Sequence, residues 1–300
     1  MSSPKGFPGI PDHWSSIFET FPSSDRAIQL SWMMHSVKKD PSFKVLLVVH
    51  GLGEHAGRYL HFPHYLQTTV GSVCCLDHRG HGRSEGPRGH VDSFDQYTSD
   101  VALAIQRLDE IFQVQFGRSE IHLLGHSLGG LIALRTLHLW PDLPVFSATF
   151  SAPLLGVKLP VPWVKKTLGQ ILSKFWGSFQ MSSELDAALL SHDPNVTKAY
   201  RSDYWVHQKI TPRFFTEMTA AMADTLSRSS GLKVPAQFLV PMQDQIVDSE
   251  MTIQYFEKLQ LKDKRLKTYP EFFHEPFNEV GKDQVFEDLK QWIQIHTMKS

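Results

Sequence analysis

Short, continuous apolar runs alternate with stretches of helical periodicity along most of the chain. The apolar runs fall at 44–50, 73–77, 121–124, 146–152 and 236–240, and a further strand is predicted at 265–269. The helical stretches fall at 65–70, 93–116, 131–140, 249–260 and 280–296. Continuous apolar runs are typical of strands that are buried on both faces, and their alternation with helices favours a parallel sheet between two helical layers. The pattern therefore predicts an α/β fold.

The start and the middle of the chain depart from this rhythm. Residues 1–25 are rich in proline and serine and are interpreted as a surface lead-in, and the alternating segment 27–37 as a half-exposed edge strand. Residues 153–231 hold helical segments and aromatic residues but no strand-like run. The sequence thus predicts one α/β core domain, formed by 1–152 and 232–300, with 153–231 inserted as a helical cap.

An amphipathic stretch lies within this predicted cap, at 163–176. Its broad apolar stripe is opposite Lys166, Gln170 and Lys174. Such a face fits either a contact with a lipid bilayer or packing against the core domain. Because only a few lysines flank it, packing against the core is slightly favoured, and both interpretations stay open.

Composition narrows the class of protein. With 41% hydrophobic and 20% charged residues in a chain of 300, a large core is expected. The net charge of −1 does not favour a nucleic-acid partner. Cys74 and Cys75 are adjacent in an apolar run and are interpreted as buried thiols in a reducing compartment. The N-terminus has no apolar signal core, and no apolar run reaches about 18 residues, so we expect a cytoplasmic protein with at most peripheral membrane contact.

The segment Gly125-His-Ser127-Leu-Gly129 lies between a predicted strand and a predicted helix. This order of strand, sharp turn and helix is the context of a nucleophile elbow, in which a strained turn lifts the serine hydroxyl clear of the sheet. A side chain at position 125 or 129 would collide with the neighbouring strand or helix, which explains both glycines. The same pattern also fits a glycine-rich turn with a functionless serine, so the remaining chain has to supply a base and an acid.

Two loops after the elbow supply candidates for these groups. A serine hydroxyl is a good nucleophile only when a base takes its proton and an acid orients that base. Asp244 follows the predicted strand 236–240, and His274 follows the last predicted strand. Asp248 is a competing acid, but it lies further from the strand end and is expected to cap the next helix. The positions favour Ser127, His274 and Asp244 as a catalytic triad.

Acyl transfer also needs backbone N–H groups directed at the developing oxyanion. Leu128 follows the candidate nucleophile at the start of a helix, where negative charge is stabilised. The loop after the strand 44–50 offers a second donor, and Leu52 is favoured because glycines on both sides let the backbone approach. We therefore predict an oxyanion hole formed by the N–H groups of Leu52 and Leu128.

The same loop fits another class of protein. Gly51-x-Gly53-x-x-Ala56 follows a strand, and Asp77 ends the next strand, as in a dinucleotide-binding fingerprint. That interpretation leaves the predicted triad without a role and is therefore a remote alternative. Several histidines nearby lack the spacing of known metal motifs, and loop hydrogen bonding explains them better: His50, His55, His78 and His81. We expect no metal and no cofactor.

The chain resembles the monoacylglycerol lipase and lysophospholipase group of the α/β-hydrolase superfamily. The blocks that carry the resemblance cover nearly the whole chain and are 50–59, 77–84, 88–91, 125–130, Asp244 and His274. The resemblance implies the α/β-hydrolase fold, with a mostly parallel sheet, helices on both faces and a helical lid. It also implies the triad and the oxyanion donors that the residues predict by themselves. These blocks are specific for the family and less specific for its substrate.

In monoacylglycerol lipases, a glutamate, an arginine, a tyrosine of the cap and a histidine shortly after the catalytic one hold the glycerol end. By this resemblance Glu54, Arg58 and Tyr200 are predicted to bind substrate. Phe277 stands three positions after His274, where the resemblance implies the second histidine, and it is predicted to contact substrate in place of that histidine. This departure leaves room for a lysophospholipid or a simple ester. For Glu54 and Arg58, a structural ion pair that shapes the loop is an equally good interpretation.

We therefore interpret the chain as a serine hydrolase that cleaves the ester of a single-chain lipid, with monoacylglycerol favoured. Lysophospholipase or general carboxylesterase activity is the alternative within the same class. A non-catalytic lipid-binding homologue and a dinucleotide-binding oxidoreductase are the alternatives from other classes. The expected partner is a small-molecule lipid ester, peripheral membrane contact through the cap stays open, and the oligomeric state is not predicted.

Overall fold

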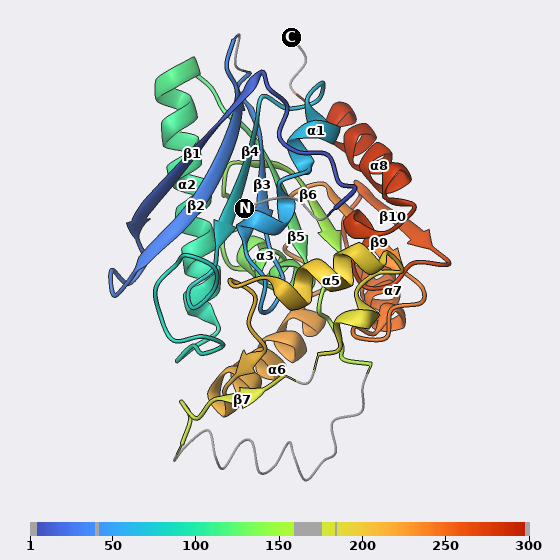
Figure 1. Ribbon diagram of the computed structural model, residues 1–300. Coiled ribbons are helices and arrows are strands. Elements are labelled where there is room, and N and C mark those ends of the chain that lie inside the picture. The colour runs from blue at the N-terminus through green and yellow to red at the C-terminus, as the bar shows by residue number, and fades with distance from the viewer. Residues whose placement is uncertain (1–4, 40–41, 159–175, 184, 298–300) are drawn as a thin grey trace.

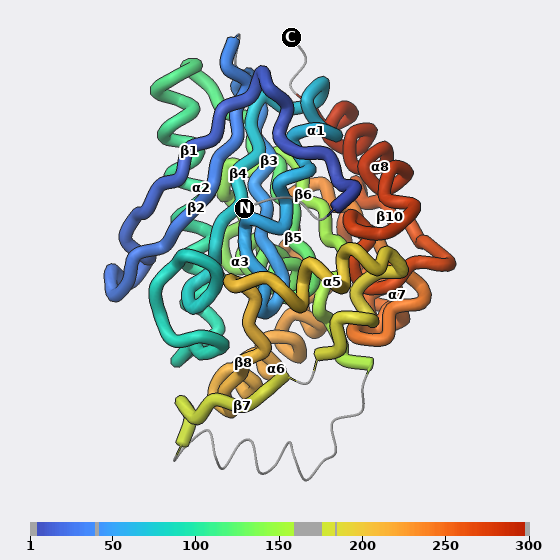
Figure 2. Tube along the Cα trace, viewed as in Figure 1, coloured from blue at the N-terminus to red at the C-terminus, as the bar shows by residue number. Residues whose placement is uncertain are grey.

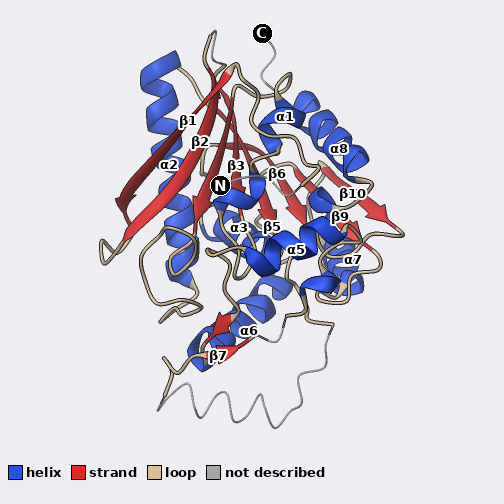
Figure 3. Cartoon of the chain, viewed as in Figure 1, coloured by secondary structure: helices blue, strands red, loops and turns tan. Residues whose placement is uncertain are grey.

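The computed structural model describes residues 5–39, 42–158, 176–183 and 185–297. Within these residues eight strands form one sheet in the order β1-β2-β4-β3-β5-β6-β9-β10 (Figures 1 and 3). β2 runs antiparallel to both β1 and β4, and the other neighbours are parallel. The strands are β1 (Trp14–Pro22), β2 (Gln29–Val37), β3 (Lys44–Val49), β4 (Ser72–Asp77), β5 (Glu120–His126), β6 (Val145–Ser151), β9 (Ala236–Pro241) and β10 (Lys264–Tyr269). The predicted α/β fold with a mostly parallel sheet is confirmed.

The N-terminal hairpin is the part of the sheet for which the prediction was wrong. Residues 14–22 form the edge strand β1 instead of a surface lead-in, and β2 is an inner strand instead of an edge. β1 pairs with β2 along its whole length, from the Trp14–Val37 pair to the Pro22–Gln29 pair. Most side chains of β1 are exposed, so its sequence has no hydrophobic signal of a buried strand. Backbone pairing with β2 places this segment in the sheet.

Helices cover both faces of the sheet. Alternate residues of β3 point to opposite faces: Leu47 joins the core cluster that includes α2, α3 and α7, and Leu46 joins the cluster that includes α1 and α8. The helices are α1 (Phe62–Leu66), α2 (Asp95–Phe116), α3 (Leu128–Leu139), α7 (Ser249–Lys258) and α8 (Lys282–Ile295). Four of them agree with the predicted helices, but α1 shares only residues 65 and 66 with the predicted segment 65–70, because Pro63 in its first turn favours initiation earlier in the chain.

The described part of the predicted cap lies at the carboxyl ends of the parallel strands (Figures 1 and 2). Its elements are β7 (Met181–Ser182), η2 (Ala187–Leu189), α5 (Pro194–Ser202), β8 (Lys209–Ile210) and α6 (Pro212–Ser227). α5 and α6 agree with the predicted helical character. The β7–β8 pair was not predicted, because two residues are too few to produce an alternating pattern.

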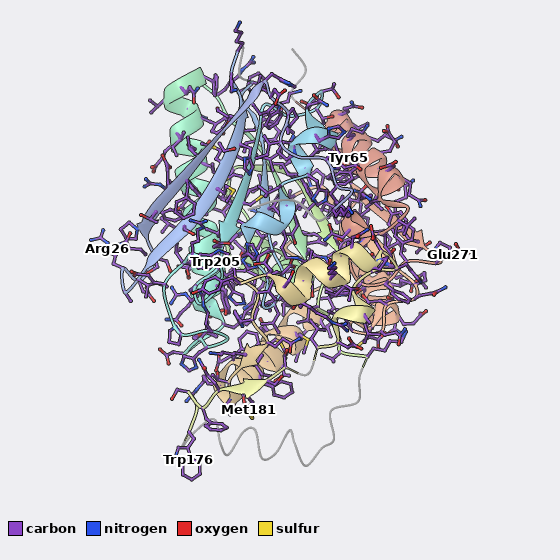
Figure 4. All side chains as sticks on the ribbon, in the orientation of Figure 1. Arg26, Tyr65, Trp176, Met181, Trp205 and Glu271 are labelled. Atoms are coloured by element: carbon purple, nitrogen blue, oxygen red, sulfur yellow. The ribbon has the colours of Figure 1, made fainter. Side chains whose placement is uncertain are left out.

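The amphipathic stretch predicted at 163–176 lies outside the described residues except for its last position. The side chain of Trp176 is exposed and points away from the body of the molecule (Figure 4). None of the described helices is both long and apolar enough to cross a membrane. Cys74 and Cys75 are free and buried in β4, as predicted.

Candidate active site

Ser127 lies at a sharp turn between β5 and α3. Its backbone has φ 54° and ψ −119°, a strained conformation for a residue that carries a side chain. A Cβ at Gly125 would lie 2.5 Å from the carbonyl oxygen of Gly129, and a Cβ at Gly129 would lie 2.0 Å from that of Val49. Close backbone approach therefore requires both glycines, as predicted, and the turn places Ser127 at the carboxyl edge of the sheet.

His274 and Asp244 reach Ser127 from two other loops at the same edge. His274 lies on the base loop (residues 270–275) that follows β10, and its Nε2 is 2.9 Å from Ser127 Oγ. Its Nδ1 is 2.7 Å from Oδ2 of Asp244, which follows β9. The other oxygen of Asp244 accepts the N–H groups of Ile246 and Val247. The three predicted side chains thus form one buried, hydrogen-bonded row.

Charge and hydrogen bonding control the protonation of this row. Burial by itself would lower the pKa of His274, but the negative charge of Asp244 and its hydrogen bond raise that pKa above the ordinary value. Burial would raise the pKa of Asp244, but His274 and two backbone N–H groups hold it below the ordinary value. Asp244 therefore stays ionised beside an imidazole that accepts a proton readily, as the activation of a serine requires.

The loop that follows β3, named the oxyanion loop here (residues 50–55), lies against the nucleophile. A Cβ at Gly51 would lie 3.2 Å from the Cβ of Ser127. Among the described residues, neither the N–H of Leu52 nor that of Leu128 is donated to a protein acceptor. Leu128 is the first residue of α3, where the helix leaves its N–H groups without internal partners. Two unused donors beside the serine are what an oxyanion hole requires.

A buried ionic cluster lies beside this row. Arg58 donates to Glu54 at 2.8 Å and to both carboxylate oxygens of Glu275, at 2.6 and 2.8 Å. The centroid of the Tyr200 ring is 4.9 Å from the Arg58 guanidinium carbon. Burial would raise the pKa of Glu275, but the charge and hydrogen bonds of Arg58 lower it. Glu54 and Arg58 form the structural ion pair that the sequence allowed, and their contact with a ligand stays a prediction.

Glu275 and His126 belong to the site but were not predicted. Glu275 follows His274 directly, so a carboxylate next to a predicted base was the available signal. His126 precedes Ser127, and its ring centroid is 5.0 Å from that of His274. Its Nδ1 donates to the carbonyl oxygen of Ser151 at 3.2 Å. Burial and the neighbouring His274 lower the pKa of His126, so a neutral imidazole lies beside the base.

Glu54, His126 and Glu275 also have the geometry of a metal site. Their ligand atoms lie within 4.8 Å of one another, and within the described part of the chain no other group of three such residues does so. However, Arg58 already pairs with both carboxylates. The guanidinium therefore provides the positive charge that a cation would otherwise bring.

Phe277 lies in the hydrophobic core instead of the polar site. It belongs to η3 (Pro276–Asn278) and is 4% exposed. Its ring centroid lies 5.0 Å from that of Phe62 in α1 and 5.0 Å from that of Phe286 in α8. The turn that begins at Pro276 directs this side chain toward α1 and α8, so we do not retain it as a substrate contact.

The alternative acid and the dinucleotide fingerprint have structural explanations. Asp248 caps α7 and accepts the N–H groups of Glu250 and Met251, as predicted. Asp77 accepts the N–H groups of Ala56 and Arg83, at 2.6 and 2.9 Å. The carboxylate that a ribose would need is thus used inside the protein.

The loop histidines also bond within the protein. His50 and His78 contact each other's backbone, because the Nε2 of His50 accepts the N–H of His78 and the Nε2 of His78 donates to the carbonyl of His50. His81 donates to the carbonyl of Arg79, and His55 pairs with Asp203 at 2.9 Å. Each of these four rings therefore has at least one hydrogen-bond partner within the protein.

Comparison with known proteins identifies the family. The family described as serine aminopeptidase, S33, matches residues 40–281. The chain belongs to this family. A monoacylglycerol lipase of Mycolicibacterium smegmatis is 29% identical over 258 residues, which cover 84% of this chain and 88% of that protein. The phospholipase YtpA of Bacillus subtilis is 26% identical over 254 residues, 84% of this chain and 96% of that protein.

A solved structure agrees with these relatives. The crystal structure of Paleococcus ferrophilus monoacylglycerol lipase superposes with a TM-score of 0.78 at 27% identity and covers 94% of this chain and 100% of that one. The resemblance to monoacylglycerol lipases and the α/β-hydrolase fold are confirmed. As a member of this family, the chain is a carboxylic ester hydrolase.

Proposed function

We propose that Ser127, His274 and Asp244 form the catalytic triad of an enzyme that cleaves monoacylglycerol to glycerol and a fatty acid. The hydrogen-bonded row, 2.9 Å from Ser127 to His274 and 2.7 Å from His274 to Asp244, carries the proposal. His274 takes the serine proton as Oγ attacks the ester carbonyl, and Asp244 stabilises the imidazolium. His274 then gives that proton to the leaving glycerol oxygen. A water molecule activated by the same imidazole releases the fatty acid from the acyl-enzyme.

The N–H groups of Leu52 and Leu128 stabilise the oxyanion of both tetrahedral intermediates in this proposal. The supporting observation is that both N–H groups lack a protein acceptor among the described residues, beside a buried nucleophile. A donor in such a water-poor site contributes a factor of roughly 10²–10³ to kcat. The negative charge therefore develops where donors are already in place.

The ionic cluster favours a neutral leaving alcohol that carries hydroxyl groups. Glu54, Glu275 and Arg58 together have a formal charge of −1 in a buried site, which repels the phosphate of a lysophospholipid. The hydroxyl of Tyr200 is buried and has no hydrogen-bond partner among the described residues. We therefore assign Glu54, Arg58 and Tyr200 to the glycerol end. Because one relative is named a phospholipase, lysophospholipid is the second candidate substrate.

We assign residues 153–231 to a cap over the acyl side of the site. Its described part hydrogen-bonds to the loops of the core: the N–H of His207 donates to the carbonyl of Gly53, and the carbonyl of Leu190 accepts the N–H of Glu275. Trp176 and Phe179 on the same segment are 68% and 63% exposed. Exposed aromatic side chains of this kind suit peripheral contact with a lipid surface from a cytoplasmic protein.

The substrate assignment is tested by rates on three esters. We expect kcat/KM to be highest for 2-oleoylglycerol, lower for p-nitrophenyl butyrate and lowest for lysophosphatidylcholine. A higher value for lysophosphatidylcholine than for 2-oleoylglycerol would overturn the assignment. A fluorophosphonate probe tests the nucleophile, and we expect it to label the wild-type protein but not Ser127→Ala. An unlabelled wild-type protein would instead indicate a non-catalytic lipid carrier.

A further inference from the structure

Glu275 connects the base loop to the oxyanion loop through charged hydrogen bonds. Its two carboxylate oxygens accept N–H groups of Arg58 at 2.6 and 2.8 Å. Arg58 also donates to Glu54 at 2.8 Å, and Glu54 accepts the backbone N–H of Gly51 at 2.7 Å. The connection therefore starts one residue after the base and ends one residue before the predicted oxyanion donor.

We propose that Glu275 is a positioning residue for ester hydrolysis: through Arg58 and Glu54 it holds the oxyanion loop in place relative to the base loop. This inference rests on the triad and oxyanion hole proposed above. Glu275 acts through two other side chains and not on the ester itself. Its role is to fix the distance between the N–H of Leu52 and the imidazole of His274.

The cluster has the burial and the geometry that such a role needs. Glu275 and Glu54 are each 4% exposed, so little water competes for their hydrogen bonds. Charge-assisted bonds are strong where water is excluded, and two parallel bonds fix orientation as well as distance. One oxygen of Glu275 also accepts the side-chain amide of Asn278 at 2.8 Å. Both oxygens of Glu275 accept hydrogen bonds. A glutamine at this position would therefore place its NH2 group opposite another N–H donor and lose one of these bonds.

The backbone of Glu275 is anchored independently of its carboxylate. Its N–H donates to the carbonyl oxygen of Leu190 at 2.9 Å. A substitution of the side chain leaves this bond intact. The effect of the carboxylate on the oxyanion loop is therefore measurable with the base loop still attached to the cap.

The charge of Glu275 also affects the pKa of His274, which provides a second measurement. A purely structural role of Glu275 would leave that pKa unchanged. Burial lowers the pKa of His274, Asp244 raises it more, and Glu275 and Glu54 add to the increase. His126 is another titratable group beside this imidazole, with the two ring centroids 5.0 Å apart, and Arg58 pairs with both Glu275 and Glu54. Removal of the Glu275 charge lowers the pKa of His274. The acidic limb of the pH–rate profile then moves to lower pH.

The test compares Glu275→Gln with the wild-type protein on 2-oleoylglycerol and p-nitrophenyl butyrate. The nitrophenyl leaving group has no hydroxyl groups for Glu54 or Arg58, so this ester reports positioning alone. We expect kcat to fall by about tenfold to a hundredfold and by the same factor on both esters, with KM little changed. The acidic limb should move to lower pH. Glu271→Gln is the matched control, since Glu271 lies exposed on the same loop (Figure 4), and we expect wild-type rates.

Two outcomes would overturn the inference. A loss confined to 2-oleoylglycerol with a raised KM would mean that Glu275 serves the leaving alcohol. Wild-type kcat on both esters, with or without a lower melting temperature, would mean that Glu275 serves stability only. A wild-type protein without fluorophosphonate labelling would instead contradict the triad, so the two failures are distinguishable.

Glu275→Asp keeps the inference testable if Glu275→Gln does not reach the wild-type circular dichroism spectrum. The shorter carboxylate keeps its charge but cannot reach both nitrogens of Arg58. We expect a loss of kcat on both esters with the acidic limb at the wild-type pH. Wild-type kcat in a folded Glu275→Asp protein would contradict the positioning role.

Discussion

The proposed triad and the ionic cluster adjoin each other at the carboxyl edge of the sheet but are held in place by different means. Ser127, Asp244 and His274 each lie in a turn or loop after a parallel strand, and backbone N–H groups orient Asp244. Arg58 lies in the short helix η1 (Ala56–Tyr59), Glu275 lies at the end of the base loop, and the two are held by the pairing of their charges. The geometry of the triad thus follows from the sheet, whereas that of the cluster follows from charge balance.

This difference has consequences for substitution. A group positioned by strand ends keeps its place when a neighbouring side chain changes. A buried ion pair depends on each partner, because removal of one leaves the other as an uncompensated charge. The rate of hydrolysis should therefore be most sensitive to substitutions in the proposed triad, and the free energy of unfolding most sensitive to substitutions in the cluster.

The largest expected effect is the loss of the correct histidine tautomer in Asp244→Asn. The asparagine oxygen can still accept the N–H groups of Ile246 and Val247, but its amide then faces Nδ1 of His274 with a donor. The imidazole would carry its proton on Nε2 and could not accept that of Ser127. We expect kcat to fall by roughly 10⁴ with an unchanged melting temperature. A loss below tenfold would show that the acid does not orient the base.

Arg58→Met tests the cluster, and its main effect should be on stability. The substitution leaves Glu54 and Glu275 buried without their cation. We expect the free energy of unfolding to fall by about 3–5 kcal/mol in urea titrations. Arg201→Met is the matched control, because the ion pair of Arg201 with Asp186 is exposed and its loss should cost less than about 1 kcal/mol. Equal losses of unfolding free energy in the two variants would contradict the distinction between the buried cluster and an exposed ion pair.

The pH dependence of hydrolysis reports on both regions together. His274 must be neutral to accept the serine proton, and its pKa lies above the ordinary value of 6.5 because Asp244 and the cluster outweigh burial. The rate should therefore fall as the pH decreases through a midpoint above 6.5, by about tenfold for each further pH unit. A measured kcat/KM profile with its midpoint below 6.5 would contradict the raised pKa.

The smallest effect is expected for Asp248→Ala, which separates the two acids that follow β9. Asp248 caps α7 through the N–H groups of Glu250 and Met251. Its loss should cost about 1 kcal/mol of unfolding free energy and leave kcat unchanged. If this variant loses activity to the extent expected for Asp244→Asn, the assignment of the acid is wrong.

Local patterns in the sequence predicted the nucleophile turn and its partners well. Gly125, Ser127 and Gly129 occupy alternate positions within five residues, so their spacing predicts the turn directly, and placement after strand ends predicted Asp244 and His274 as its partners. The edge strand β1 was missed because it is largely exposed and carries no apolar pattern. Phe277 was misplaced because a family position does not state which way a side chain turns.

The sequence by itself determined the layered α/β core and predicted the residues of the proposed triad, since apolar periodicity and strand-end motifs are local properties of the chain. Only the tertiary structure decided which charges pair beside the proposed triad. Arg58 and Glu275 are separated by 217 positions, and no local spacing relates them. Their contact exists because parallel strands bring distant loops to one edge of the sheet, where burial leaves each charge in need of the other.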